Sequence, residues 1–237
     1  MKFGIVQFPG SNCDADAFYV VQQLLKEEAF YLWHEEETLQ NADCIILPGG
    51  FAHGDYLRAG AMAKISSIMK SVEKFAEAGG LVLGICNGFQ ILTEAGLLPG
   101  ALLKNQCGKF ICDWIYLNVE NSETPFTRLY KKGEILRMPI AHGEGCYYLD
   151  EAGLEKLEKN GQVVFRYCDS RGNFSPESNP NGSLAYIAGI CNKEKNVLGL
   201  MPHPERCAEP LLGGTDGLLL FQSLLTLKVH GSPASAL

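Results

Sequence analysis

The chain has 237 residues, of which 46% are hydrophobic and 20% charged, and its formal net charge at pH 7 is −7. This composition is that of a globular protein with a sizeable core, and the acidic balance, with no basic run longer than two lysines, argues against nucleic acid or an anionic membrane as a partner. The start of the chain lacks the features of a signal peptide and no apolar stretch approaches the ~18 residues of a membrane span, so we expect a cytoplasmic protein.

The first half of the chain predicts a parallel sheet covered by helices. Three apolar runs, at residues 2–8, 42–50 and 79–85, are typical of buried parallel strands. Helices are expected between them, at 14–29 and 59–78, the second with apolar residues three and four positions apart. Strands that alternate with helices indicate right-handed crossovers and an α/β fold with helices on both faces of a mostly parallel, twisted sheet.

The second half predicts a smaller antiparallel part. Four further strands are expected, at residues 110–120, 162–168, 184–190 and 197–201. A polar turn at 191–196 joins the last two strands and indicates a hairpin. A helix at 216–229 closes the sequence, and the tail from about 230 to 237 is expected to be loose. Because no repeat or linker interrupts this order, we expect one domain over residues 1–237.

Cys86 lies in the string GICNG, between an expected strand and an expected helix. A sharp turn from strand to helix brings the two backbones close together, and Gly84 and Gly88 occupy the two crowded positions, which is the spacing of the G-x-S-x-G nucleophile elbow. The crowding leaves no room inward, so we expect an exposed, nucleophilic Cys86. A helix end favours a thiolate by only ~0.3–1 kcal/mol, too little to activate a thiol, so a histidine is also required.

Further site residues are expected around this cysteine. The Asn87 N–H follows the nucleophile and is the natural first oxyanion donor, and the glycine turn at 48–50 ends a neighbouring strand and offers a second. Gln90 lies on the same helical face as Cys86. Its amide could contact a substrate there, or Gln90 could be an ordinary helix residue. Cys13 also follows a strand, but the acidic residues beside it oppose a thiolate, which makes it the weaker candidate nucleophile.

Two histidines could act as the base, and each precedes a glutamate by two positions: His142 with Glu144, and His203 with Glu205. In an extended segment, residues two apart point to the same side, so either glutamate could orient its own histidine. Prolines on both sides of His203 restrict its backbone, whereas glycines leave His142 looser. Since catalytic groups benefit from being held still, this difference favours His203.

Metal and nucleotide sites have no sequence support. The nine cysteines contain no C-x-x-C pair, which argues against a structural zinc site and against a disulfide framework. No Walker-type phosphate loop is present, so an ATP site is not expected in this chain. We therefore expect neither a metal nor a cofactor here.

The strings GICNGFQ, LPGGF and PHPE occur in this order, and with them essentially the whole chain resembles the class I, triad-type glutamine amidotransferases. GICNG is shared across that family. The longer string PGGFAHGDYLRAGA, at 48–61, is more specific and is similar to the branch of the family that serves purine biosynthesis. The resemblance implies a flavodoxin-like fold and the hydrolysis of glutamine to glutamate and ammonia.

The resemblance also implies a role for each matching residue. For His142 it implies a structural role or a contact with a partner protein. These roles are Cys86 as nucleophile, His203 as base and then acid, Glu205 as orienting carboxylate, Gly50 and Asn87 as oxyanion N–H donors, and Gln90 as a contact of bound L-glutamine.

Partners are implied as well. The purine branch works with a large synthetase subunit that binds ATP, magnesium and formylglycinamide ribonucleotide, together with a small third subunit, and ammonia passes between them through a protected channel. Three alternatives stay open: an amidotransferase of another pathway, a stand-alone hydrolase with an elbow cysteine, and a non-catalytic subunit whose triad is vestigial.

Overall fold

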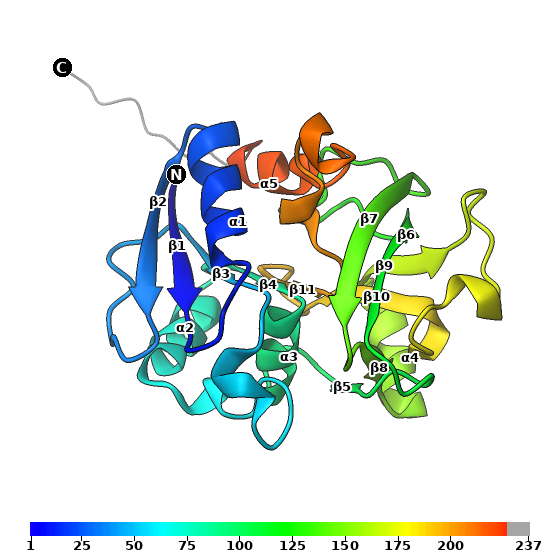
Figure 1. Cartoon of the computed structure of the whole chain (residues 1–237), viewed down its shortest axis with the longest axis horizontal. Helices are drawn as coiled ribbons and strands as arrows, with labels where there is room; N and C mark the ends of the chain where they lie inside the picture. Colours follow the sequence, from blue (N-terminus) through cyan, green and yellow to red (C-terminus); the bar gives the residue numbers. More distant parts are fainter. Residues whose placement is uncertain (227–237) are drawn as a thin grey trace.

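A nine-stranded sheet runs through the molecule, in the computed structural model that describes residues 1–226 (Figure 1). The expected loose tail lies outside these residues. The strands follow the order β2 (Glu28–Trp33), β1 (Lys2–Gln7), β3 (Cys44–Leu47), β4 (Leu81–Ile85), β11 (Val197–Leu200), β10 (Ile187–Cys191), β9 (Val163–Cys168), β6 (Ile111–Val119) and β7 (Ile135–His142).

The sheet has a parallel part and an antiparallel part. In the order given, the strands from β2 to β11 are all parallel to one another. From β11 to β7, each strand is antiparallel to the next. The predicted hairpin of β10 and β11 and the antiparallel portion in the second half are confirmed, but the strand expected from residue 184 begins only at Ile187, after a 3-10 turn at Leu184–Tyr186. A separate two-stranded sheet pairs β5 (Ala101–Leu103) with β8 (Cys146–Tyr148).

Helices lie on both sides of the sheet: α1 and α5 are in the upper part of Figure 1, and α2, α3 and α4 in the lower part. Between them, all residues of β3 and β4 are buried, as expected for parallel strands covered on both faces. One hydrophobic core joins both halves of the chain, which agrees with a single α/β unit. The helices are α1 (Asp14–Tyr19), α2 (Ser67–Glu77), α3 (Asn87–Glu94), α4 (Glu151–Lys159) and α5 (Leu218–Leu225).

Two predicted helices are too long. The helix expected at 14–29 ends with a π-helical turn at Val20–Leu24, and the following residues pair with β1 as the edge strand β2. The helix expected at 59–78 begins only at Ser67, because the preceding segment lies against α3: a side chain at Gly60 would meet the Gln90 backbone at 2.8 Å. In both places, tertiary contacts override the local helical pattern.

The sequence analysis did not predict β2, β5, β7, β8 or α4. Of these, β7 matters most for the site, because it ends at His142. Pro139 interrupts its pattern, and a proline inside a strand is tolerated here because β7 is at the edge of the sheet.

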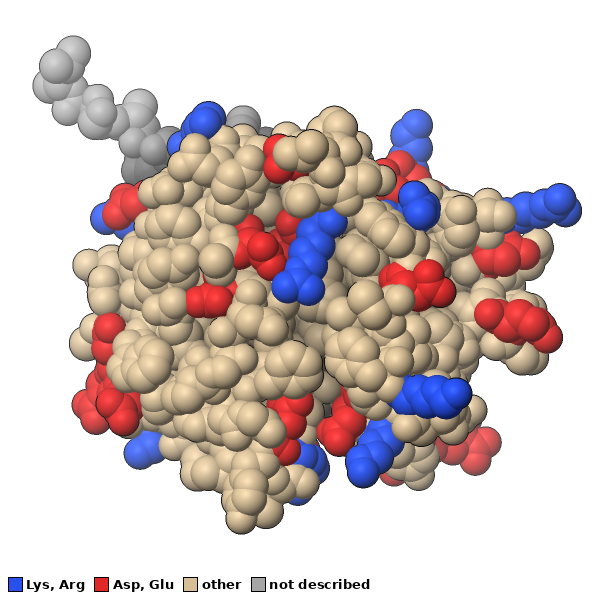
Figure 2. Space-filling model, in the orientation of Figure 1, with Lys and Arg blue, Asp and Glu red and all other residues tan. Residues whose placement is uncertain are grey.

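The charge distribution agrees with the composition. On the face shown in Figure 2, lysine and arginine side chains stand apart from one another among acidic ones, and they form no continuous basic patch there. Within residues 1–226, no helix combines the length and the apolar character that crossing a bilayer would require.

Candidate active site

Cys86 forms the predicted elbow between β4 and α3, and its backbone has φ 49° and ψ −103°, a conformation that L-residues rarely adopt. The two glycines lie where the strand and helix backbones approach closely. A Cβ at Gly88 would lie 1.9 Å from the Leu47 carbonyl oxygen, and one at Gly84 would lie 2.7 Å from the Gly88 carbonyl oxygen. The nucleophile-elbow prediction is therefore confirmed in its geometry.

The predicted exposure of this thiol is wrong, because Cys86 is only 4% exposed. Its Sγ lies 3.6 Å from the carbonyl oxygen of Ala141, a residue of β7. The cover comes from β7, which the sequence analysis missed. The elbow turns the cysteine away from the helix–sheet contact, but a distant strand then closes over it.

His203 lies beside the elbow because of the sheet register. Strands β4 and β11 are parallel neighbours in which Ile85 pairs with Leu200, so the residues after both strands emerge at the same edge. The Nδ1 atom of His203 is 2.6 Å from Oε1 of Glu205, and both side chains are buried. The sequence-predicted pair is therefore brought together in the core of the molecule.

The electrostatics of His203 suit proton transfer. Burial alone would lower the pKa of the imidazole, but the Glu205 carboxylate and then the Cys86 thiol outweigh it, so the pKa lies well above its usual value. The Nε2 atom is buried and makes no hydrogen bond within the described residues, while the Cys86 thiol is close enough to interact with the ring. The ring can thus exchange a proton with Cys86 while Glu205 holds its other side.

The alternative pair of His142 and Glu144 does not form. His142 Nδ1 lies 3.1 Å from the side-chain oxygen of Asn105, whereas the Glu144 carboxylate accepts the Ala59 N–H at 3.3 Å. Burial, followed by the charge of His203, lowers the pKa of His142 to about 4, so the ring is neutral near pH 7. A neutral histidine without a carboxylate partner does not fit the role of the base.

Cys13 approaches the same imidazole from another direction. Burial is the main cause of its raised pKa, and its thiol contacts His203 without standing on an elbow. Among the residues that the structure describes, Cys13, His203 and Glu205 form a group whose possible ligand atoms lie within 4.8 Å of one another, as a metal site would need. Within this group, Oε1 of Glu205 is hydrogen-bonded to Nδ1 of His203, so these two atoms already have each other as partners.

The predicted oxyanion donors flank the elbow. Asn87 is the first residue of α3, so its N–H has no acceptor within the helix. Gly50, at φ 139°, faces the backbone of Ser11 in an isolated β-bridge and lines the same cavity as Cys86. The Asn87 side chain accepts the Ala52 N–H at 3.0 Å, which ties α3 to the loop after Gly50. The donor roles themselves stay predictions.

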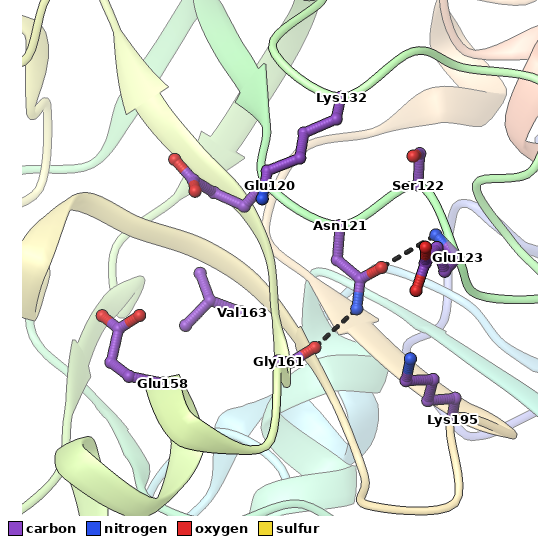
Figure 3. Close-up of a pocket in the computed structure, with 9 residues that line it drawn as sticks. All are labelled: Glu120, Asn121, Ser122, Glu123, Lys132, Glu158, Gly161, Val163 and Lys195. Carbon is purple, nitrogen blue, oxygen red and sulfur yellow. Dashed lines mark hydrogen bonds between the residues drawn. The ribbon is translucent and has the colours of Figure 1, made fainter.

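A small cavity of about 60 Å³ lies at Cys86, with Gln90, Gly50 and His142 in its wall. A larger cavity, of about 420 Å³, lies elsewhere and is lined by polar side chains that include Glu120, Glu123, Glu158, Lys132 and Lys195 (Figure 3). None of the candidate active-site residues lines that larger cavity, so cavity size does not identify the active site.

Residues 1–213 match the CobB/CobQ-like glutamine amidotransferase domain. The chain belongs to this family. It is 57% identical over 236 residues to "Phosphoribosylformylglycinamidine synthase subunit PurQ" of Moorella thermoacetica, with all of both chains covered. It is 58% identical over 231 residues to the protein of the same name from Thermosynechococcus vestitus, covering 95% of this chain and 96% of that protein.

Solved structures agree with this amidotransferase fold. A chain of "PurLQS from Thermotoga maritima" superposes with a TM-score of 0.85 at 46% identity, covering 96% of this chain and 98% of that one. The glutaminase domain of Trypanosoma brucei CTPS with bound acivicin has a TM-score of 0.60 at 14% identity and covers 95% of this chain and 94% of that one, so it shares the fold alone. The fold class and the enzyme class expected from the sequence are both confirmed.

The amidotransferase site also contains a residue that sequence reasoning missed. Asp55 lies in the loop after Gly50, lines the cavity at Cys86, and has φ 52°. Burial and then the charge of Glu144 raise the pKa of Asp55 to about 6, against the effect of the Asn87 amide that donates to it. The available signal was its place in the string PGGFAHGD, directly after the expected oxyanion turn.

Gln90 has a more specific place than its helical spacing indicated. Its Nε2 donates to the backbone carbonyl of Glu144 at 2.6 Å, and its Oε1 accepts the Asn87 side-chain amide at 2.8 Å. The amide therefore links α3 to the segment after β7 across the cavity. Contact of Gln90 with bound glutamine stays a prediction.

Proposed function

We propose that this chain is the glutaminase subunit of phosphoribosylformylglycinamidine synthase and releases ammonia from L-glutamine for a synthetase subunit. The observation that carries the chemistry is the buried 2.6 Å contact of His203 with Glu205 beside the elbow Cys86. Full-length identity of 57% to a PurQ subunit supports the choice of de novo purine (IMP) biosynthesis over another pathway.

In the proposed reaction, His203 takes the thiol proton and Cys86 attacks the side-chain amide carbon of glutamine. The negative charge that develops on the amide oxygen is stabilised by the N–H groups of Asn87 and Gly50, and such a donor is worth about 10²- to 10³-fold in rate. His203 then protonates the departing nitrogen, and ammonia leaves a thioester on Cys86. A water activated by His203 attacks the thioester and frees glutamate, while Glu205 keeps the ring oriented.

The ammonia is consumed by another chain. We propose that a large synthetase subunit binds ATP, magnesium and formylglycinamide ribonucleotide, and that a small third subunit completes the complex. Ammonia reaches the synthetase through a protected channel within this complex, which is located in the cytoplasm. No metal or cofactor is assigned to this chain. The subunit name of the PurQ relatives and the PurLQS name of the solved relative support work within a complex.

Glutaminase activity, measured with and without the candidate synthetase, tests the proposal. We expect the complex to form glutamate from glutamine and to amidate formylglycinamide ribonucleotide with ATP. The Cys86→Ala variant should lose both activities with glutamine but keep the second with added ammonia. Amidation of a different acceptor would reassign the pathway.

A thiol-alkylating glutamine analogue separates the two candidate nucleophiles. We expect it to label Cys86 in the wild type and in Cys13→Ala, which keeps its activity within a few-fold, and to leave Cys86→Ala unlabelled. Labelling at Cys13, or labelling nowhere, would support the non-catalytic alternative.

A further inference from the structure

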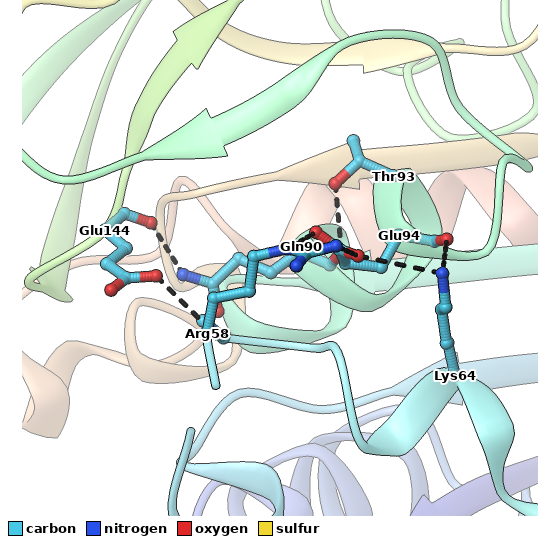
Figure 4. Close-up of polar contacts among 7 residues, drawn as sticks. Arg58, Lys64, Gln90, Thr93, Glu94 and Glu144 are labelled. Atoms are coloured by element: carbon cyan, nitrogen blue, oxygen red, sulfur yellow. Dashed lines mark hydrogen bonds and ion pairs between the residues drawn. The ribbon is translucent and has the colours of Figure 1, made fainter. Parts of the chain in front are cut away.

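Two carboxylates that the proposed reaction does not use face the cavity at Cys86. Asp55 and Glu144 both line it, and within residues 1–226 no lysine or arginine does. Arg58 is the nearby cation, but its guanidinium is bound by both carboxylate oxygens of Glu94 at 2.6 Å (Figure 4). The cavity therefore presents negative charge beside the nucleophile without a basic side chain in its wall.

Neutral groups hold these carboxylates in position. Glu144 Oε2 accepts the Ala59 N–H at 3.3 Å, and the Glu144 backbone carbonyl accepts the Gln90 amide (Figure 4). Asp55 Oδ1 accepts the Asn87 side-chain amide at 3.3 Å. An ionised carboxylate can accept about four hydrogen bonds, so each keeps capacity for a ligand.

A third group in the cavity wall, the His142 ring, also offers an acceptor. Asn105 Nδ2 donates to the carbonyls of Lys109 and His142, so its Oδ1 is the acceptor that faces His142 Nδ1. His142 Nδ1 must then carry the proton of the neutral ring, and Nε2 carries the lone pair. His142 is 3% exposed, and this Nε2 has no hydrogen-bond partner within the described residues.

Acceptors in a cavity whose described wall contains no lysine or arginine fit a ligand group that is positively charged and donates hydrogen bonds. L-Glutamine carries such a group in its α-ammonium, three carbons away from the amide that Cys86 attacks. We propose that Asp55 and Glu144 bind the α-ammonium group of glutamine, and that His142 Nε2 supplies a further acceptor in the same cavity. The site would then select an α-amino acid over a simple amide. This inference rests on the proposed glutaminase function.

The charges in the cavity agree with this assignment. Burial, and then repulsion by the charge of Glu144, raises the pKa of Asp55. A bound ammonium offsets that repulsion and favours the ionised form of Asp55. Binding through two charge-assisted contacts also explains why these side chains are oriented by uncharged donors, which do not compete for their charge.

The test compares two substrates in the complex with the synthetase: L-glutamine, and glutaramate, which is glutamine without its α-amino group. The variants are Asp55→Asn and Glu144→Gln, which remove the charge at almost constant shape. We expect each to lower kcat/KM for glutamine by about 10- to 100-fold, mainly through KM, and to change kcat/KM for glutaramate much less. Glu123→Gln, in the separate cavity of Figure 3, is the matched control and should behave as the wild type.

An equal loss for both substrates in both variants would overturn the inference, because the carboxylates would then act on structure and not on the ammonium. Calorimetry gives a readout without turnover: in a Cys86→Ala complex, adding Asp55→Asn should weaken the binding of glutamine about 10-fold or more. Unchanged affinity would likewise refute the contact. Selective glutamine binding without turnover by the wild type would instead refute the proposed function and leave this contact standing.

Discussion

His203 combines two properties that a catalytic base needs at the scale of a single residue. Glu205 bonds its Nδ1 atom inside the protein, which fixes both the ring orientation and the tautomer, while Nε2 stays available near the thiol. The buried carboxylate also raises the pKa of His203, as stabilisation of the imidazolium in the proposed reaction requires. The ring of His142 is also oriented, by Asn105, but no carboxylate stabilises its charged form and its pKa is lowered.

The Glu205→Gln substitution should therefore lower kcat sharply while leaving the fold intact. An amide of the same shape can still occupy the site but cannot stabilise the charged ring, and loss of the equivalent charge in a triad costs up to about 10⁴-fold. We expect a loss of roughly 10²- to 10⁴-fold in steady-state glutaminase activity, with unchanged circular dichroism. The control is Glu194→Gln, an exposed substitution in the turn between β10 and β11. Activity within a few-fold of the wild type would show that Glu205 is not the orienting group.

His142 should make the protein sensitive to acid. Its pKa in the fold is about 4, below the ordinary value of 6.5, so the folded state binds fewer protons than the unfolded state between these pH values. The contribution of the neutral ring is full above pH 6.5 and falls by up to about 3 kcal/mol as the pH drops to about 4. Asp55 acts in the opposite direction, because its pKa is raised to about 6.

Urea unfolding of the wild type and of His142→Gln at pH 7 and at pH 4.5 isolates this effect, since Asp55 contributes equally to both proteins. We expect the wild type to lose more of its free energy of unfolding than the variant over this interval. Parallel losses in the two proteins would contradict the neutral, buried assignment of His142.

At the scale of elements, the sequence was informative where contacts are local and much less so where they are long-range. The apolar strands β3 and β4 and the glycine spacing around Cys86 follow from neighbouring residues, so the elbow could be predicted. The burial of the thiol could not, because its cover is β7, which begins 49 residues after Cys86 and contains a proline. Flanking prolines favoured His203 over His142, but the contact of His142 with Asn105 in place of Glu144 could not be predicted, because no local pattern connects the two residues.

Gly88→Ala tests the close contact between α3 and β3. Alanine gains up to about 1 kcal/mol in helix propensity, but its Cβ would lie 1.9 Å from the Leu47 carbonyl oxygen, a backbone atom that cannot turn aside. We expect a net loss of about 1–3 kcal/mol in the free energy of unfolding, measured by urea denaturation. Gly143→Ala is the control for stability, because its Cβ would find its nearest atom at 3.7 Å. A neutral or stabilising Gly88→Ala would show that α3 can move away from β3.

At the scale of the whole molecule, apolar side chains are exposed near the entrance to the site. Phe51 lines the cavity at Cys86 and lies near Phe110, with ring centroids 6.3 Å apart. Both rings are about half exposed. Tyr56 and Leu57, in the same loop as Phe51, are more exposed than these rings. Positive φ angles at His53 and at two other non-glycine residues of this loop indicate that its conformation is strained. A partner that covers this loop would bury apolar surface and set the backbone next to Gly50.

The isolated chain should accordingly be a poor glutaminase. We expect the synthetase to raise kcat/KM for glutamine by at least about 10-fold, because docking orders the oxyanion loop and enlarges a cavity that is small in the chain alone. Glutaminase assays with increasing synthetase measure the effect, and hydrogen exchange should slow at residues 51–57 in the complex. Full activity of the purified chain by itself would contradict this prediction.

The position of β11 has a consequence for the order in which the enzyme can become active during its synthesis. This strand lies between β4 and β10 in the sheet, yet it comes long after β4 and Cys86 in the sequence. A growing chain that already carries Cys86 has neither the central strand nor the histidine that follows it. With His203 as the proposed base, ammonia release cannot begin on the ribosome before β11 and His203 have been made, which keeps a growing chain from consuming glutamine.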